Sequence, residues 1–143
     1  TNMEIPSLTS PRSKKNLEAS FYKKLKTNQK KFRPDLKFTR LESWASQGVP
    51  DLVICSENGI FYFVELKTTN GVAVKLSPHQ VSWLTQHKHA PTYIFVHTKK
   101  SEIFVYTGLQ AVELVDRGLL LEPLHHFSAP INWDEFFNLT LPI

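Results

Sequence analysis

The chain has 143 residues and 41% hydrophobic content, which suits one domain with its own core and is too little for two comfortable ones. No apolar run approaches the about 20 residues that span a membrane, so no membrane partner is expected, and neither is a secretory signal. The net charge of +4 is uneven, because residues 1–40 hold eleven Lys and Arg against three acids, whereas the other residues hold six against ten. This balance fits a protein that gathers a polyanion, although a solvated helix face with a lysine-rich tail would have the same composition.

Residues 1–13 contain two prolines and several Ser and Thr, and they predict a flexible lead-in to a single domain over residues 14–143. A helix is expected over about residues 15–27, because apolar side chains recur there every four residues and share one face. Lysines on and after this helix are candidates for binding nucleic acid: Lys23, Lys24, Lys30 and Lys31.

Residues 36–44 predict the first strand, although their alternation of apolar and polar side chains is imperfect. Arg40 and Glu42 share a face of this strand. They form an ion pair with each other or across strands in one interpretation. In the other interpretation Arg40 contacts nucleic acid.

Two further strands are predicted on either side of Asn58-Gly59, and the second of them carries Glu65 and Lys67. Side chains two apart on a strand share a face, so these two charges project together from an apolar strand. Charges in such a place must be paired or bind a metal. An ordinary hairpin with a solvent-exposed ion pair is the alternative.

Asp51 follows Pro50 at the start of the first strand of this hairpin. A plain two-residue turn at Asn58-Gly59 would place Asp51 on the opposite face from Glu65. We therefore predict a three-residue loop or a bulge, which would set Asp51 across from Lys67 and Val53 across from Glu65.

After the hairpin, a loop leaves Lys75 near the candidate site, and a helix begins after Ser77. Ser77 is a good N-cap, and Gln80 stands at the position of a capping-box partner. Gln80 thus has a structural interpretation as well as a functional one. Two strands, at 92–97 and 102–107, and two helices follow, and the scattered histidines do not have the spacing of a zinc site.

The order of these elements predicts an α/β protein with a mixed sheet flanked by helices. The ordered residues Gly48, Pro50, Asp51, Glu65, Lys67 and Gln80 resemble the PD-(D/E)XK nuclease superfamily, and within it the VRR-NUC and phage Holliday-junction-resolvase-like endonucleases. The resemblance covers about residues 36–97 and implies a restriction-endonuclease-like core. It implies catalytic roles for Asp51, Glu65, Lys67 and Gln80, with metal bound by Asp51, Glu65 and the backbone carbonyl of Leu66. Glu42 and Glu18 are the candidates for an additional acid.

The function that this resemblance implies is a Mg²⁺-dependent or Mn²⁺-dependent endonuclease, a hydrolase of DNA phosphodiester bonds. The favoured substrates are branched DNA and replication or repair intermediates rather than linear duplex. A catalytically idle nucleic-acid-binding module of the same fold is the alternative, and a structural protein with a buried ion-pair network is a third. We expect a cytoplasmic protein, in the bacterial host cell if a phage encodes it. A homodimer is also expected, because the segment with Trp133, Phe136 and Phe137 exceeds the needs of one small core.

Overall fold

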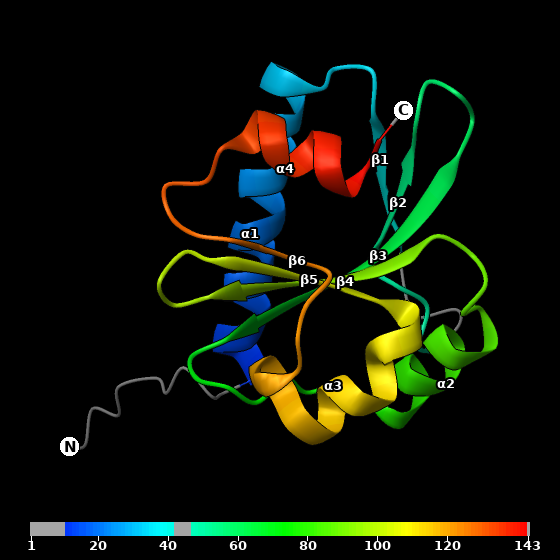
Figure 1. Ribbon diagram of the computed structural model, residues 1–143, viewed down its shortest axis with the longest axis vertical. Helices are drawn as coiled ribbons and strands as arrows, with labels where there is room; N and C mark the ends of the chain where they lie inside the picture. The colour runs from blue at the N-terminus through cyan, green and yellow to red at the C-terminus, as the bar shows by residue number, and fades with distance from the viewer. Residues whose placement is uncertain (1–10, 42–46, 143) are drawn as a thin grey trace.

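The computed structural model describes residues 11–41 and 47–142, and Figure 1 shows how their helices and strands are arranged. A long helix comes first, three antiparallel strands follow, and a second helix leads to a parallel strand. The elements are α1 (Pro11–Phe32), β1 (Lys37–Arg40), β2 (Leu52–Cys55), β3 (Phe61–Thr69), α2 (Pro78–Gln86), β4 (Thr92–Thr98), β5 (Ile103–Thr107), η1 (Gly108–Gln110), α3 (Ala111–Arg117), η2 (Gly118–Leu120), β6 (His125–Phe127) and α4 (Trp133–Thr140).

The strands form one six-stranded sheet in the order β1-β2-β3-β4-β5-β6. β3 and β4 are parallel, and the other neighbouring strands are antiparallel. A parallel pair needs a crossover connection, which α2 supplies. The mixed sheet flanked by helices confirms the predicted α/β class, and the element order is that of the expected restriction-endonuclease-like core.

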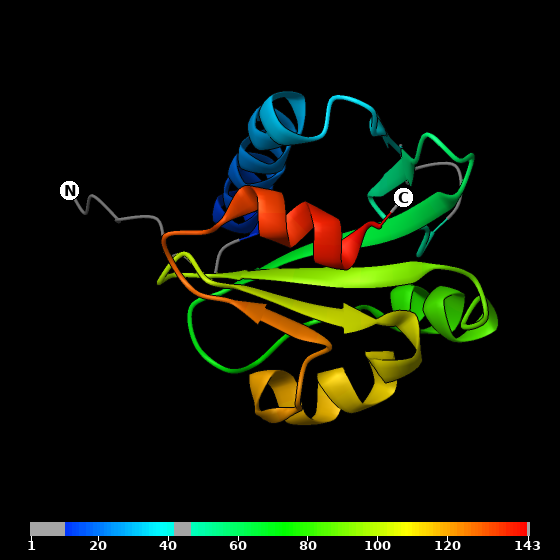
Figure 2. The same cartoon turned by 45° about the horizontal axis from the view of Figure 1, so that its top comes forward.

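Helices cover both faces of the sheet, and Figure 2 shows α1 and α4 on one side with α2 and α3 on the other. Val64 and Leu66 of β3 belong to the core cluster that includes residues of α1 and α4. Glu65 and Lys67 lie on the other face, where their β4 neighbours belong to the cluster with α2 and α3. Because the middle of β3, from Val64 to Leu66, is buried on both faces, a charge there needs a partner within the fold.

The β2–β3 hairpin has the longer loop that its sequence predicts. Ser56 and Ile60 pair through a backbone hydrogen bond of 2.9 Å, which leaves three residues in the loop, and Gly59 takes a left-handed φ of +84°. The predicted pairing is wrong by two residues, since Val53 lies across from Phe63 instead of Glu65. The reason is that the loop occupies 57–59 rather than 58–60, with glycine at its third position, where a left-handed residue is required.

Helix α1 is longer than predicted at both ends. It begins at Pro11, so residues 11–13 belong to the helix rather than to a lead-in. Proline is favoured at the first helical position, which accounts for this start. The helix continues to Phe32 and ends just before Pro34, because a proline disfavours helical geometry in the residue before it. Residues 1–10 lie outside the described part of the chain.

The aromatic residues of α4 are core residues of this chain. Phe136 and Phe137 are both 0% exposed, and their rings meet at 5.2 Å between centroids. Trp133 packs against the same cluster. The expectation that these side chains exceed what one core needs is therefore wrong, and they no longer support a homodimer.

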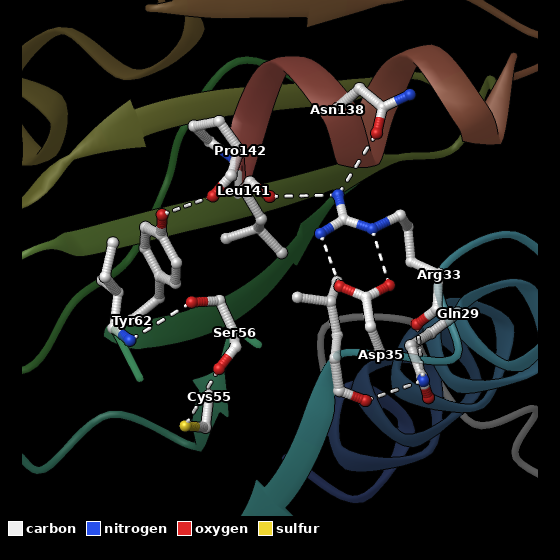
Figure 3. Close-up of polar contacts among 11 residues, drawn as sticks. Gln29, Arg33, Asp35, Cys55, Ser56, Tyr62, Asn138, Leu141 and Pro142 are labelled. Carbon is white, nitrogen blue, oxygen red and sulfur yellow. Dashed lines mark hydrogen bonds and ion pairs between the residues drawn. The ribbon is translucent and has the colours of Figure 1, made fainter. Parts of the chain in front are cut away.

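A buried polar network joins the end of α1 to the end of α4, as Figure 3 shows. Arg33, 7% exposed, donates two hydrogen bonds of 2.9 Å to the Asp35 carboxylate. It also donates to Asn138 Oδ1 at 3.2 Å and to the carbonyl oxygen of Leu141 at 3.1 Å. The hydrogen bond to Asp35 raises the pKa of Arg33, and the same bond lowers the pKa of Asp35. Arg33 therefore stays charged and connects segments more than 100 residues apart.

No helix within residues 11–41 and 47–142 is long and apolar enough to cross a membrane.

Candidate functional site

The site forms around Glu65, in the middle of β3. Its side chain is 2% exposed, and the Lys67 ammonium lies 3.6 Å from its Oε2. Both side chains project from the same face of the strand because they are two residues apart. The side chain of Lys67 is 15% exposed, so it reaches from solvent to a buried carboxylate.

Asp51 is held in place by hydrogen bonds at two points. Its carbonyl oxygen accepts a backbone hydrogen bond of 2.8 Å from Leu41, and its Oδ2 accepts one of 2.9 Å from the backbone N–H of Leu66. The β2–β3 register pairs Leu52 with Val64, so one step further it places Asp51 beside Glu65, not beside Lys67 as predicted. The two carboxylates that the sequence singles out therefore lie next to each other.

The neighbourhood raises the pKa of Glu65 well above the usual value for glutamate. Burial is the largest cause, and the negative charge of Asp51 is the second. Lys67 opposes these effects without cancelling them. A buried carboxylate beside another carboxylate favours either a proton or a cation between them.

Gln80 combines the predicted capping-box position with contacts to Glu65 and Lys67. In the capping box of α2, its backbone N–H donates to Ser77 Oγ at 3.1 Å and its Oε1 accepts from the Ser77 N–H at 2.9 Å. The same side chain donates through Nε2 to Glu65 Oε2 at 3.0 Å and accepts from Lys67 Nζ at 3.1 Å. The helix cap thus fixes the amide that connects Glu65 to Lys67.

A surface pocket of about 330 Å³ opens beside these side chains. Its lining combines the loop before β2 with the first turn of α2: Gln47, Gly48, Val49, Asp51, Ser77, His79 and Gln80. Asp51 and Gln80 thus face an open space that a phosphate group could enter. A second pocket of about 330 Å³, beneath α1 on the other face of the sheet, contains His97 but none of these residues.

Gly48 allows the pocket loop to approach α2 closely. Its φ is +87°, and a Cβ at this position would overlap the backbone carbonyl of His79 and approach Gln80 N to 3.1 Å. Glycine is therefore required here twice, once by the backbone conformation and once by the contact.

We expect Gly48→Ala to lower the free energy of unfolding by at least about 2 kcal/mol, since a left-handed alanine costs about 1–2 kcal/mol before any overlap. Gly59→Ala is the matched control, because Gly59 has a φ of +84° and a Cβ added there would meet no atom within 4 Å. Urea denaturation of both variants separates the conformational cost from the contact. Equal destabilisation in the two variants would contradict the close approach to α2.

The other candidate residues were not found among the contacts described above. Glu18, on α1, contributes the smallest of the effects that raise the pKa of Glu65. Glu42 lies outside the described residues. The Arg40 guanidinium lies 4.4 Å from the ring centroid of Tyr22 on α1, so it is engaged on the other face of the sheet. Lys75 and four lysines of α1 are exposed to solvent: Lys23, Lys24, Lys30 and Lys31.

The site has a donor set that suits a hard divalent cation. Asp51 and Glu65 supply carboxylate oxygens, which Mg²⁺ and Mn²⁺ prefer. The pKa of Glu65 is raised first by burial and then by the negative charge of Asp51, and a cation would offset that charge. Within 11–41 and 47–142, no group of three or more His, Cys, Asp and Glu side chains could hold a metal. A site in this part of the chain therefore needs further ligands, such as the backbone oxygen predicted for Leu66, a side-chain amide oxygen or water.

Aromatic side chains that were not predicted as functional lie on the two elements that build the site. Trp83 follows Gln80 on α2, His87 caps the end of that helix at helical spacing from Trp83, and Phe61 and Phe63 precede Glu65 on the same face of β3. The spacing of three residues from Gln80 to Trp83 and of four from Trp83 to His87, together with the period of two before Glu65, is the signal that identifies them.

No protein-family model matches the chain, and no curated protein sequence matches it significantly. Among solved structures, the chain is similar to Hjc, a Holliday junction resolvase from the archaeal hyperthermophile Archaeoglobus fulgidus. The two chains are 14% identical, with a TM-score of 0.48 over 66% of this chain and 76% of that one. The chemistry of the site is therefore inferred from its own side chains.

Proposed function

We propose that this protein is a metal-dependent endonuclease that hydrolyses DNA phosphodiester bonds. The observation that carries the proposal is the buried Glu65 beside Asp51, joined to Lys67 and Gln80 at the edge of an open pocket. A retired site would have no reason to keep buried charges, because uncompensated charges cost stability. This argues against the alternative of an idle binding module.

Each side chain has a distinct task in the proposed reaction. Asp51 and Glu65 would hold Mg²⁺ or Mn²⁺ with the backbone carbonyl of Leu66. When bound, the cation offsets negative charge on the phosphate and helps to generate the nucleophile. Lys67, held by Gln80 at 3.1 Å, orients the water and stabilises charge that develops on the phosphate oxygens. Gln80 fixes the side chains of Lys67 and Glu65 relative to each other, because it is hydrogen-bonded to both.

The proposed substrate is DNA recognised through its phosphates. The exposed lysines of α1 supply positive charge without base-specific geometry, since contacts to phosphates fix position rather than sequence. A nuclease of this kind is restricted by the shape of its substrate, so we propose branched DNA over linear duplex. A homodimer that cuts opposed strands remains part of this proposal.

The test uses the purified chain with labelled linear, flap and four-way DNA of matched sequence, and with RNA of the linear sequence. Each substrate is incubated with Mg²⁺, Mn²⁺ or EDTA. Internal cleavage of DNA with either metal, none in EDTA, and faster cleavage of branched substrates are expected. Full activity in EDTA would overturn the metal dependence, and equal rates on linear and four-way DNA would overturn the preference for branches.

A further inference from the structure

Four aromatic side chains extend from the site along β3 and α2. On β3, Phe61 and Phe63 share a face with Glu65, and at about 3.3 Å per residue Phe63 lies about 7 Å along the strand from it. On α2, Trp83 comes three residues after Gln80, and the exposed His87 follows Trp83 just beyond the helix. We call Phe61, Phe63, Trp83 and His87 the aromatic strip.

The rings of the aromatic strip are packed in a defined order. Phe63 and Trp83 have their centroids 5.5 Å apart, at an interplanar angle of 52°. Trp83 and His87 are stacked at 3.8 Å and 17°. Because His87 Nδ1 lies 2.7 Å from the Trp83 carbonyl oxygen, a hydrogen bond holds the imidazole parallel to the indole. The stack therefore ends in a fixed and exposed flat ring.

The sheet next to the aromatic strip remains accessible. Phe61 is 56% exposed although it lies in a paired strand. Its cross-strand neighbour is Cys55 of β2, and the neighbour of Cys55 is Lys37 of the edge strand β1, which is exposed. The neighbouring segment 77–90 carries three histidines and Lys88 but no acid. This segment beside the strip is thus neutral or basic, which suits a polyanion with flat apolar groups, whereas Glu57 lies in the loop before Phe61.

We propose that the aromatic strip stacks unpaired nucleobases of the strand whose phosphate occupies the Glu65 site. This assignment rests on the proposed nuclease function and specifies its substrate class, which is DNA with a single-stranded segment next to the cleaved bond. Aromatic side chains bind such strands because every base has a stacking face, and basic neighbours follow the phosphates. Paired bases cannot use the strip, since their faces are already stacked within the duplex.

Binding is measured in EDTA by the fluorescence anisotropy of a labelled thymidine oligonucleotide, so that no cleavage occurs. A second ligand of equal length has abasic sites and keeps only the phosphates. The variants Phe61→Ser and His87→Ala change exposed side chains, and each should weaken binding of the thymidine ligand about 5- to 10-fold. Binding of the abasic ligand should change less than about twofold, because phosphate contacts remain.

Two controls match the variants in chemistry but lie elsewhere. His126 stacks on Phe104 at 4.1 Å and 18°, so His126→Ala removes a similar stacked imidazole. Leu109 is 66% exposed, so Leu109→Ser removes a similar exposed apolar side chain. Neither control should change the affinity for either ligand.

Unchanged affinity in Phe61→Ser and His87→Ala, or equal losses for both ligands, would overturn the strip as a stacking surface. A dimer mass that Phe61→Ser abolishes, together with unchanged affinity, would assign the strip to a second copy of the chain and also overturn it. Cleavage by the wild-type chain in Mg²⁺ is measured separately. Cleavage without base-dependent binding would reject only the strip, whereas base-dependent binding without cleavage would reject the nuclease function.

Discussion

Asp51→Asn and Glu65→Gln are each expected to reduce DNA cleavage by at least about 10²- to 10³-fold, the loss typical of removing one electrostatic group from an active site. Both amides keep the shape of the carboxylates but not the charge that would hold a cation. DNA affinity in EDTA should stay within about threefold, because the phosphate contacts are proposed to come from the exposed lysines of α1 and not from these carboxylates. Rates under single-turnover conditions and anisotropy titrations measure the two effects.

The stability of Glu65→Gln distinguishes a lost function from a damaged fold. Burial and Asp51 raise the pKa of Glu65, so the ionised form opposes folding at neutral pH. In EDTA at pH 7 the variant should therefore unfold at a higher urea concentration than the wild type. The difference in stability between the variant and the wild type should shrink as the pH falls below the pKa that Glu65 has in the folded protein. Towards the ordinary pKa range of glutamate, the wild-type carboxyl becomes protonated and is then uncharged like the amide of the variant.

Glu102→Gln is the control for the glutamate substitution. Glu102 is partly buried and hydrogen-bonded to Thr98 and His126, but it lies outside the site. The Glu102→Gln variant should therefore cleave DNA at the wild-type rate. Undiminished cleavage by both Asp51→Asn and Glu65→Gln would reject the assignment of the site.

Local rules predict part of the site, because the alignment of Glu65 with Lys67 and the capping-box position of Gln80 each follow from the geometry of a single element. The place of Asp51 depends on the pairing of β2 with β3, and it was predicted beside Lys67 instead of Glu65. The period of two on a strand aligns Glu65 with Lys67, and the capping box directs Gln80 back from the start of α2. The hairpin sequence also predicts a longer loop. The predicted register is wrong by two residues because Asn58-Gly59 fits two three-residue loops, and the pairing of Ser56 with Ile60 decides between them.

Features that depend on distant contacts were not predictable from local patterns. Strand β6 has only three residues and exists because it pairs with β5. The burial of Phe136 depends on the rings of Phe95 and Phe127, which come from two strands of the sheet. Whether the aromatic side chains of α4 are buried or exposed therefore could not be judged from the apolar content of that segment alone.

The Arg33 network is another such feature, and Arg33→Ala is expected to lower the free energy of unfolding by about 3 kcal/mol. The guanidinium is 7% exposed and makes hydrogen bonds to Asp35, Asn138 and Leu141. Its removal leaves the Asp35 carboxylate and the Leu141 carbonyl without this donor, which costs more than the lost attraction alone. Urea denaturation followed by far-UV circular dichroism measures the change.

Arg117→Ala is the matched control, because Arg117 and Glu113 form an ion pair of 3.5 Å with side chains 50% and 62% exposed. Such pairs contribute less than about 0.5 kcal/mol. Arg33→Lys should fall between the two, since lysine keeps the charge but cannot reproduce the forked contact with Asp35. If Arg33→Ala were no more destabilising than Arg117→Ala, the network would not stabilise the junction of α1 and α4. If Arg33→Lys equalled the wild type, the charge rather than the fork would account for the stability.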